Sequence, residues 1–391
     1  MNDYMEAAER SLVHTYNRFP VVLDRGEGVY LYDTEGKKYL DFAAGIAVSG
    51  LGYADQELTE ALKGQIDRLM HTSNLYYNTS CAKAARGLLK ASGMDRVFFT
   101  NSGTEANEGA LKAARKYAWK KGTGRYEWIA MKDSFHGRTM GALSVTEHQA
   151  YRTPFEPLIP GVSFAEFNNL DSVRSLVTDR TCAIILEPIQ GEGGINMATS
   201  EFMSGIRRLC DEEGILMICD EIQCGMARTG SMFAWQSYGT RPDIITMAKA
   251  IGSGVPVGAF GMTEEVAAYS LEPGDHGTTY GGNPFACAAV AKTLEIFEQR
   301  KLCDHVREVG AYLTEELDRL VDECETLVER RGIGLIQGLR MSEPVAGTIA
   351  RALEEGLLLI SARSDVIRLV PPLVIEKEHV DEMIGKLKKI L

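Results

Sequence analysis

The sequence predicts an α/β fold, with a large domain built on a mostly parallel sheet and a smaller α+β domain. The chain has 391 residues, of which 45% are hydrophobic and 25% charged, a composition typical of a globular protein with two domains. Short, uniformly apolar runs alternate with helical segments in its first two thirds. Polar side chains gather where these runs end, which indicates one functional site at the edge of a sheet.

Five apolar runs are predicted to be strands of the large sheet. They span residues 97–99, 128–131, 183–186, 215–219 and 244–248. Their apolar residues are continuous rather than alternating, as in strands that are buried on both faces. The helical segments 104–121 and 201–213 suit the crossover connections of a parallel sheet.

The two ends of the chain are expected to form the smaller domain together. Beyond residue 283 the pattern predicts helices at 288–299, 306–324, 344–356 and from 376 onward, and strands at 334–341, 357–360 and 366–370. An N-terminal hairpin, residues 28–32 and 38–42, joins this domain in the prediction. The predicted organisation is an N-terminal segment (1–45), a large domain (46–283) and a small domain (284–391).

Charge and composition exclude several classes of function. The formal net charge is −12 and no Lys/Arg stripe occurs, which argues against nucleic acid as a partner. The acidic N-terminus and the lack of a long apolar run favour a cytoplasmic protein that does not contact a membrane. The eight cysteines include no Cys-x-x-Cys pair, so neither a disulfide framework nor a metal site is expected.

The stretch TNSGTEANEGALKAARKYAWKK, residues 100–121, predicts a strand that turns into a helix at Ser102, Gly103 and Thr104. Unpaired amides and the helix dipole make such an N-terminus suitable for a phosphate group, but a simple N-cap explains the same residues. The stretch contains neither a Walker A sequence nor the Gly-x-Gly-x-x-Gly of a nicotinamide dehydrogenase.

Asp220 and Lys249 each end an apolar strand. A buried Asp220 could cap the next helix, pair with an arginine, or face a protonated ring nitrogen. A buried Lys249 has a lowered pKa, so its neutral amine can condense with an aldehyde. Together with a phosphate site, these two residues match the needs of pyridoxal 5′-phosphate (PLP).

Arg138 and Arg368 are candidates for binding substrate carboxylates, although most arginines are simply solvated. His136 is expected to be a packed or surface residue. Phe135 is expected in the core or against a flat cofactor ring.

Six motifs resemble, in order and spacing, the class III aminotransferases of fold type I. They are NSGTEANE (101–108), SFHGRT (134–139), EPIQGEGG (187–194), DEIQCGMARTG (220–230), AKAIGSGVPVGA (248–259) and HGTTYGGNP (276–284). The resemblance implies that Lys249 is the catalytic residue that carries PLP. It implies the following further cofactor contacts: Ser102, Gly103, Thr104 and Thr279 at the phosphate, Phe135 and Ile222 on the ring faces, and Glu187, Asp220 and Gln223 around the ring.

Within that class, the sequences of residues 15–48 and of HTSNLYYN (71–78) are most similar to those of the bacterial subgroup that uses acetylornithine as amino donor. By this resemblance Arg138 and Tyr16 hold the donor carboxylate. Arg368 holds that of 2-oxoglutarate or glutamate and pairs with Glu192 when the donor is bound. The resemblance also implies a homodimer in which Thr279 reaches the partner's phosphate and Thr278 lies near the substrate.

Other amino donors remain open at this point. Ornithine, succinylornithine, 4-aminobutyrate and N-succinyldiaminopimelate all react through the same cofactor chemistry. A non-catalytic binding protein on the same fold is a more remote alternative, against which the presence of Lys249, Asp220, Arg138 and Arg368 argues.

Overall fold

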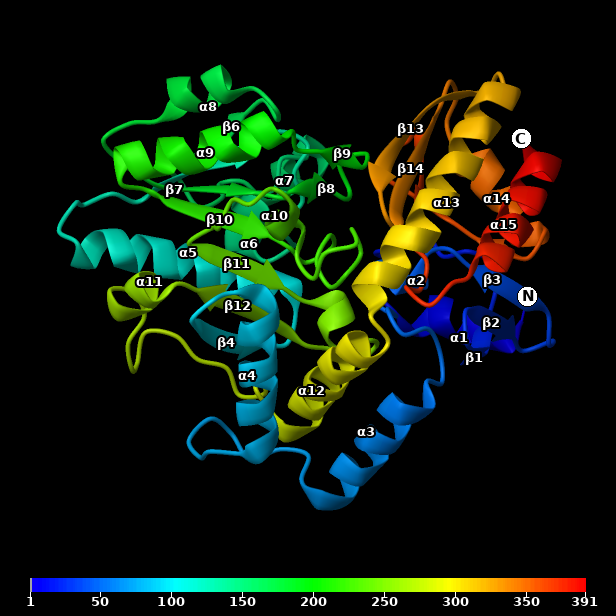
Figure 1. Ribbon diagram of the computed structural model, residues 1–391, viewed down its shortest axis with the longest axis horizontal. Coiled ribbons are helices and arrows are strands. Elements are labelled where there is room, and N and C mark those ends of the chain that lie inside the picture. The colour runs from blue at the N-terminus through cyan, green and yellow to red at the C-terminus, as the bar shows by residue number, and fades with distance from the viewer. Residues whose placement is uncertain (1) are drawn as a thin grey trace.

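The computed structural model describes residues 2–391 and shows a large α/β part beside a smaller C-terminal part (Figure 1). The large part contains a seven-stranded sheet of order β4-β12-β11-β10-β7-β5-β6. Its strands are β4 (Arg96–Thr100), β5 (Glu127–Met131), β6 (Val162–Ala165), β7 (Thr181–Leu186), β10 (Leu216–Asp220), β11 (Ile244–Met247) and β12 (Gly258–Met262). Only β12 runs antiparallel to its neighbours, so the predicted mostly parallel sheet is confirmed.

All five predicted strands belong to this sheet, and the sequence analysis missed two more, β6 and β12. In β12, Gly258 and Gly261 weaken the strand pattern because glycine has no side chain to pack. β6 is a four-residue edge strand that contains a polar serine, Ser163. Both strands lack the continuous run of large apolar side chains on which the prediction relied.

Helices connect the strands of the large part and cover the sheet (Figure 1). They include α4 (Thr79–Ser92), α5 (Gly103–Lys120), α6 (Met140–Ser144), α7 (Gln149–Arg152), α8 (Leu170–Leu176), α9 (Ser200–Glu213), α10 (Ala234–Ser237) and α11 (Glu264–Ala268). α5 and α9 confirm the two predicted crossover helices. α5 begins at the N-cap Ser102, and α9 ends where Gly214 adopts a positive φ of 63°.

The smaller part consists of two four-stranded sheets, one of which is built from both ends of the chain. The first sheet joins β13 (Leu327–Ile333), β14 (Ile336–Met341), β17 (Val366–Leu369) and β16 (Ile360–Ser361). The second joins β1 (Leu23–Glu27), β2 (Tyr30–Asp33), β3 (Lys38–Asp41) and β15 (Leu357–Leu358). Because β3 pairs with β15, the N-terminal hairpin does join the C-terminal part as expected. β13 was not predicted, because its central residues Glu329-Arg330-Arg331 are charged and hide the strand pattern.

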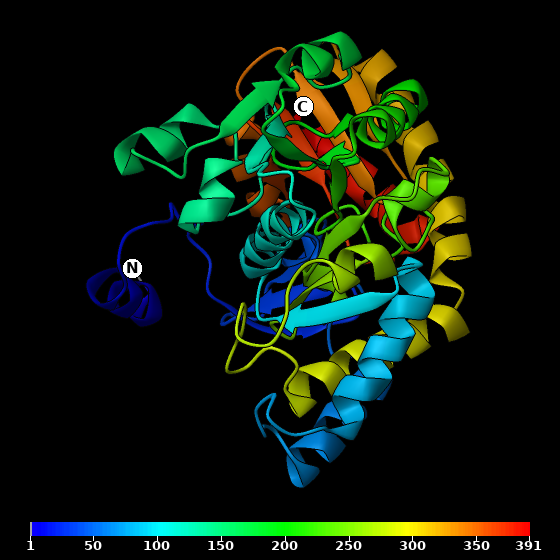
Figure 2. The same cartoon turned by 90° about the vertical axis from the view of Figure 1, so that its left-hand side faces the viewer.

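The other helices of the described chain lie at its two ends. They are α1 (Asp3–Ser11), α2 (Ala44–Ala47) and α3 (Gln56–Arg68), then α12 (Pro284–Gln299), α13 (Leu302–Glu323), α14 (Ala346–Glu354) and α15 (Lys377–Ile390). Seen from the side, α1 stands apart from the rest of the molecule (Figure 2), and none of its residues is buried. No helix within residues 2–391 is long and apolar enough to cross a membrane.

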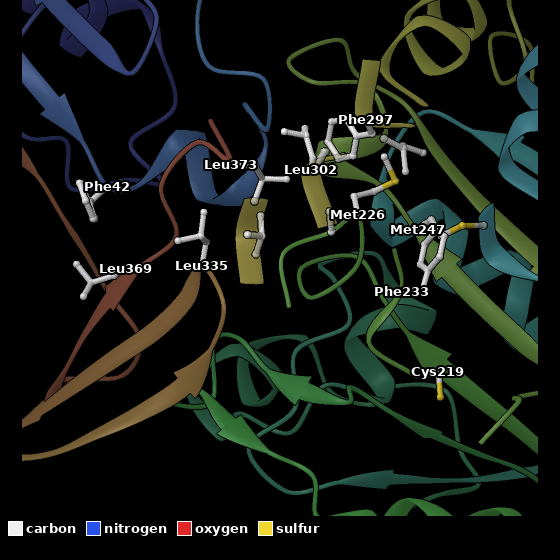
Figure 3. Packing of buried hydrophobic residues seen from close by; sticks show 14 of the residues in the cluster. Phe42, Cys219, Met226, Phe233, Met247, Phe297, Leu302, Leu335, Leu369 and Leu373 are labelled. Carbon is white, nitrogen blue, oxygen red and sulfur yellow. The ribbon is translucent and has the colours of Figure 1, made fainter. Parts of the chain in front are cut away.

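One apolar core runs through both parts of the molecule. Figure 3 shows Met247 and Phe233 of the large part in the same cluster as Leu335 and Leu369 of the C-terminal sheet. α12 bridges the two, because Leu294 packs on Gly87 of α4 while Phe297 enters this cluster. The domain boundaries at residues 45 and 283 therefore stay a prediction.

Candidate active site

A cavity of about 430 Å³ opens at the carboxyl edge of the large sheet. It is lined by predicted site residues from several strand ends: Ser102, Gly103, Thr104, Phe135, Arg138, Glu187, Asp220, Ile222, Gln223 and Lys249. The structure thus brings together residues that are up to 147 positions apart (249 − 102). This placement agrees with the expectation of a single site at the edge of the sheet.

Lys249 lies just after β11, in a short 3-10 turn (Lys249–Ile251). Its φ of 52° places it in the left-handed region, a conformation that costs a non-glycine residue roughly 1 kcal/mol or more and is concentrated at functional sites. Burial lowers the pKa of its amine to about 8, and the nearby charge of Arg368 adds to this effect. A sizeable fraction of the amine is therefore neutral, and nucleophilic, near physiological pH.

Asp220 is the last residue of β10 and is only 3% exposed. One carboxylate oxygen, Oδ2, accepts hydrogen bonds from Asn107 Nδ2 at 2.8 Å and His136 Nδ1 at 2.7 Å. The other, Oδ1, accepts from the backbone N–H of Ile222 at 3.0 Å. A carboxylate can accept about four hydrogen bonds, so Asp220 keeps capacity for one more donor from the cavity.

His136 is a site residue that the sequence analysis did not assign. Its imidazole is buried and donates to Asp220 through Nδ1, while its Nε2 has no hydrogen-bond partner in the described part of the chain. Asn107, on the buried face of α5, was missed as well. Neither contact has a sequence signal, since His136 and Asp220 are 84 positions apart and Asn107 and Asp220 are 113 apart.

The turn between β4 and α5 combines both roles that its sequence allowed. Ser102 caps the helix, because its hydroxyl accepts from the backbone N–H of Glu105 at 3.3 Å. The backbone N–H groups of Gly103 and Thr104 lie in the first turn of α5, where a helix offers them no acceptor. Both residues line the cavity, at the positive end of the helix dipole. A Cβ on Gly103 would lie 2.8 Å from Cδ1 of Ile222, so glycine is required for the turn and Ile222 to approach one another.

Glu187 fixes the loop that carries Phe135. Its carboxylate accepts from the backbone N–H of Phe135 at 3.0 Å and of Gly191 at 3.1 Å. Burial raises the pKa of this carboxyl to about 7. Glu187 therefore acts on the site through the backbone of its neighbours as well as by lining the cavity.

Arg368 on β17 is 3% exposed, and both of its terminal nitrogens donate to other residues of the protein. Its guanidinium donates to Glu192 Oε1 at 2.6 Å, to Gln223 Oε1 at 3.0 Å and to the carbonyl of Ser361 at 3.1 Å. The pairing with Glu192 that the resemblance implied is thus present in the structure. A substrate carboxylate at Arg368 would compete with Glu192 for the Nη1 donor.

Arg138 is in the opposite state. It lines the cavity, is exposed, and makes no hydrogen bond or ion pair with any of residues 2–391. Its guanidinium carbon lies 3.5 Å from the ring centroid of Tyr151 and 5.6 Å from that of Phe135. All its N–H donors remain available to a ligand carboxylate.

Besides Arg368 and Glu192, three predicted site residues do not line this cavity. Tyr16 is 71% exposed, and the guanidinium of Arg18 lies 5.9 Å from its ring centroid. Thr278 lies beside the cavity wall, where its hydroxyl accepts from Asn101 Nδ2 at 3.1 Å. Thr279 is exposed. Their expected roles at a substrate or at a partner's cofactor stay predictions.

The chemistry of these donors fits PLP. A strand-end lysine with a lowered pKa can hold the aldehyde, the N-terminus of α5 suits the phosphate, and Asp220 has a free acceptor position for the ring nitrogen. Within residues 2–391, no three His, Cys, Asp or Glu side chains are grouped so that they could hold a metal ion. The fold and this site together define a PLP-dependent enzyme of fold type I.

The chain belongs to the class-III aminotransferases, whose family model, "Aminotransferase class-III", matches residues 12–391. It is 44% identical to the acetylornithine aminotransferase of Methanocaldococcus jannaschii, over 99% of this chain and 98% of that protein. It is 47% identical to the acetylornithine aminotransferase of Aquifex aeolicus, over 97% and 99% of the two chains.

Solved structures agree with this assignment. The ornithine aminotransferase of Toxoplasma gondii matches with a TM-score of 0.94 and 31% identity, over 99% of this chain and 94% of that one. The acetylornithine aminotransferase of Elizabethkingia anophelis matches with a TM-score of 0.88 and 30% identity, over 99% and 97%. The protein is therefore a PLP-dependent aminotransferase.

Proposed function

We propose that this enzyme transfers the terminal amino group of N2-acetyl-L-ornithine to 2-oxoglutarate. The products are N-acetyl-L-glutamate 5-semialdehyde and L-glutamate, and the reaction is reversible. We place it in arginine biosynthesis in the cytoplasm. The observation that carries the proposal is the contrast between two arginines near Lys249: Arg138 has no hydrogen-bonding or ionic partner among residues 2–391, whereas Arg368 is paired with Glu192.

The two arginines suit two substrates that react at different positions. Acetylornithine reacts at its far amine, so its carboxylate needs a cation at a distance from Lys249, a role that suits Arg138 with help from Tyr16. Glutamate reacts at its α-carbon, so its α-carboxylate needs a cation closer to the amine. Arg368, whose charge lowers the pKa of Lys249, suits that role. A carboxylate that covers or uncovers Arg368 then sorts the two substrates.

PLP supplies the aldehyde carbon and an electron-accepting ring when it is bound. Lys249 Nζ would hold the aldehyde and then take the proton from the substrate carbon that bears the amine. Asp220, oriented by Asn107 and His136, would keep a proton on the ring nitrogen. Gln223 would meet the ring hydroxyl.

The walls of the site would orient the same group. Phe135 and Ile222 would contact the two ring faces. Ser102, Gly103 and Thr104 would bind the phosphate with the unpaired amides of α5.

We also propose a homodimer with shared sites. Thr279 of one subunit would contact the phosphate held by the other, with Thr278 next to it near the substrate. The exposed position of Thr279 supports this arrangement.

A side-by-side donor panel tests the proposed substrate. Specificity constants (kcat/KM) with 2-oxoglutarate would be measured for acetylornithine, succinylornithine, ornithine, 4-aminobutyrate and N-succinyldiaminopimelate. We expect acetylornithine to exceed ornithine by at least about tenfold. A higher value for ornithine or for either succinylated donor would replace the proposed substrate with that donor.

A further inference from the structure

Arg138 is held in an unusual way for a residue at a binding site. Its guanidinium is stacked on the face of Tyr151 at 3.5 Å, and within residues 2–391 it has no hydrogen-bonding or ionic partner. An arginine side chain carries about 2 kcal/mol of rotamer entropy, which weakens binding if it must be ordered by the ligand. A planar ring contact can reduce that loss without occupying any N–H donor.

Tyr151 is itself held in place on its other side. The ring of His148 stacks against it, with ring centroids 3.9 Å apart and an interplanar angle of 15°. Both residues flank or belong to α7 (Gln149–Arg152), where the backbone N–H of Tyr151 donates to the carbonyl of His148 at 2.9 Å. The neighbouring Arg152 lies over the ring of Phe164 in β6, 4.5 Å from its centroid, and so ties α7 to the sheet edge.

Stacking on Tyr151 leaves the N–H donors of Arg138 free to bind a carboxylate, whereas an ion pair with another residue would occupy them. A carboxylate partner would occupy in-plane N–H donors, as Glu192 occupies the Nη1 donor of Arg368. An aromatic face contacts only the π surface of the guanidinium, so the in-plane donors stay free for bidentate binding. The two arginines of the site are therefore maintained in different states by different kinds of contact.

We infer that Tyr151 is a positioning residue, which holds Arg138 ready to receive the carboxylate of the amino donor. This inference rests on the proposed function, in which Arg138 serves the donor and Arg368 serves glutamate. Tyr151 acts through Arg138, so its loss affects one half of the reaction. His148 is the second layer of the same stack.

Steady-state kinetics of Tyr151→Ala and Tyr151→Phe in the PLP-loaded enzyme test the inference. We expect Tyr151→Ala to raise KM for acetylornithine about five- to thirtyfold, with kcat and the KM for glutamate within about twofold of the wild type. Tyr151→Phe should keep KM within about twofold, because the phenol hydroxyl makes no hydrogen bond within residues 2–391. Tyr32→Ala is a matched control, since Arg25 lies 3.6 Å from the Tyr32 ring on the distant hairpin.

Arg138→Ala measured in parallel separates the two hypotheses. If Arg138→Ala raises KM for acetylornithine and Tyr151→Ala does not, the positioning role is wrong and the proposed function stands. If Arg138→Ala leaves that KM unchanged, the division of labour between the arginines fails, and the inference fails with it. An equal rise in KM for acetylornithine and for glutamate in Tyr151→Ala also overturns the inference. So does a rise in KM for acetylornithine in Tyr151→Phe that is as large as in Tyr151→Ala. Should Tyr151→Ala not fold, Tyr151→Leu keeps the apolar volume without a π face and is read in the same way.

Discussion

At the scale of single residues, the site depends on placing ionisable groups where burial changes their chemistry. Lys249 is buried near Arg368, and both facts lower the pKa of its amine, to about 8. The same environment that makes the amine reactive makes its charged form costly to the folded protein. Reactivity and stability are therefore opposed at this residue.

This opposition predicts a pH-dependent stability. The pKa of Lys249 is about 8 in the folded protein and about 10.5 when unfolded, so the unfolded chain binds more protons between these values. The cost is fully present below pH 8 and disappears as pH rises toward 10.5, and the shift corresponds to roughly 3 kcal/mol. We expect cofactor-free Lys249→Met to be more stable than wild type at pH 7, with the difference shrinking by pH 10.

Urea unfolding midpoints of the cofactor-free proteins at both pH values measure this effect. Lys63→Met on the exposed face of α3 is the control, because the Lys63 side chain is 65% exposed. A stability difference that stays constant with pH would mean that burial does not lower the pKa of the Lys249 amine.

The Glu192–Arg368 pair gives a second prediction at this scale. Glu192→Gln removes the charge that covers Arg368, so a glutamate carboxylate meets less competition. We expect KM for glutamate to fall about three- to tenfold, while KM for acetylornithine falls less or rises. Initial rates in both directions measure these KM values. Glu329→Gln is the control, because it removes the charge that pairs with Arg340 between β13 and β14. Equal changes for both substrates would contradict the gating role of Glu192.

At the scale of elements, the position of α5 sets the geometry of the phosphate end of the site. Gly109 lets this helix lie directly on β12, because a Cβ there would come within 2.2 Å of the ring of Phe260. Phe260 is fully buried and stacks on Phe98, so it has little room to move. The helix, and with it Ser102 to Thr104, is held close to the sheet by this contact.

We expect Gly109→Ala to destabilise the protein by about 1–3 kcal/mol and to weaken PLP binding. Gly64→Ala in α3 is the matched control, because nothing lies within 4 Å of a Cβ at that position. The control should be neutral or stabilising by up to about 1 kcal/mol. Urea unfolding and PLP titration measure both variants, and similar results for the two would show that α5 has room to move.

The elements also show what the sequence could predict. Lys249 and Asp220 were assigned because each ends a strong apolar strand, and the structure places both strands side by side. β12 and β13 were missed because glycines in one and charges in the other break the apolar pattern. His136 and Asn107 were not assigned because their contacts with Asp220 arise only from the pairing of distant segments. The stack of Tyr151 on Arg138 likewise depends on how α7 folds back, which no residue spacing encodes.

At the scale of the whole molecule, a segment with exposed apolar side chains is attached to the loop that carries Thr279. Leu75, Tyr76 and Tyr77 are 87%, 69% and 107% exposed. Their segment is fixed to the threonine loop by Asn74, whose amide donates to the carbonyl of Gly281 at 2.8 Å. Such a patch indicates a protein interface and suits the proposed homodimer.

A subunit-mixing experiment tests whether the sites are shared. Lys249→Ala lacks the reactive amine, and Thr279→Asp places a negative charge where the proposal expects a phosphate, so each homodimer should be nearly inactive. In a mixed dimer, one site combines the intact Lys249 of one subunit with the intact Thr279 of the other, and the second site carries both defects. Random exchange of equal amounts makes half of the dimers mixed, so activity should recover to about a quarter of the wild-type value. Native mass spectrometry of differently tagged subunits confirms the exchange, and no recovery in a mixture shown to contain mixed dimers would mean that Thr279 serves its own subunit.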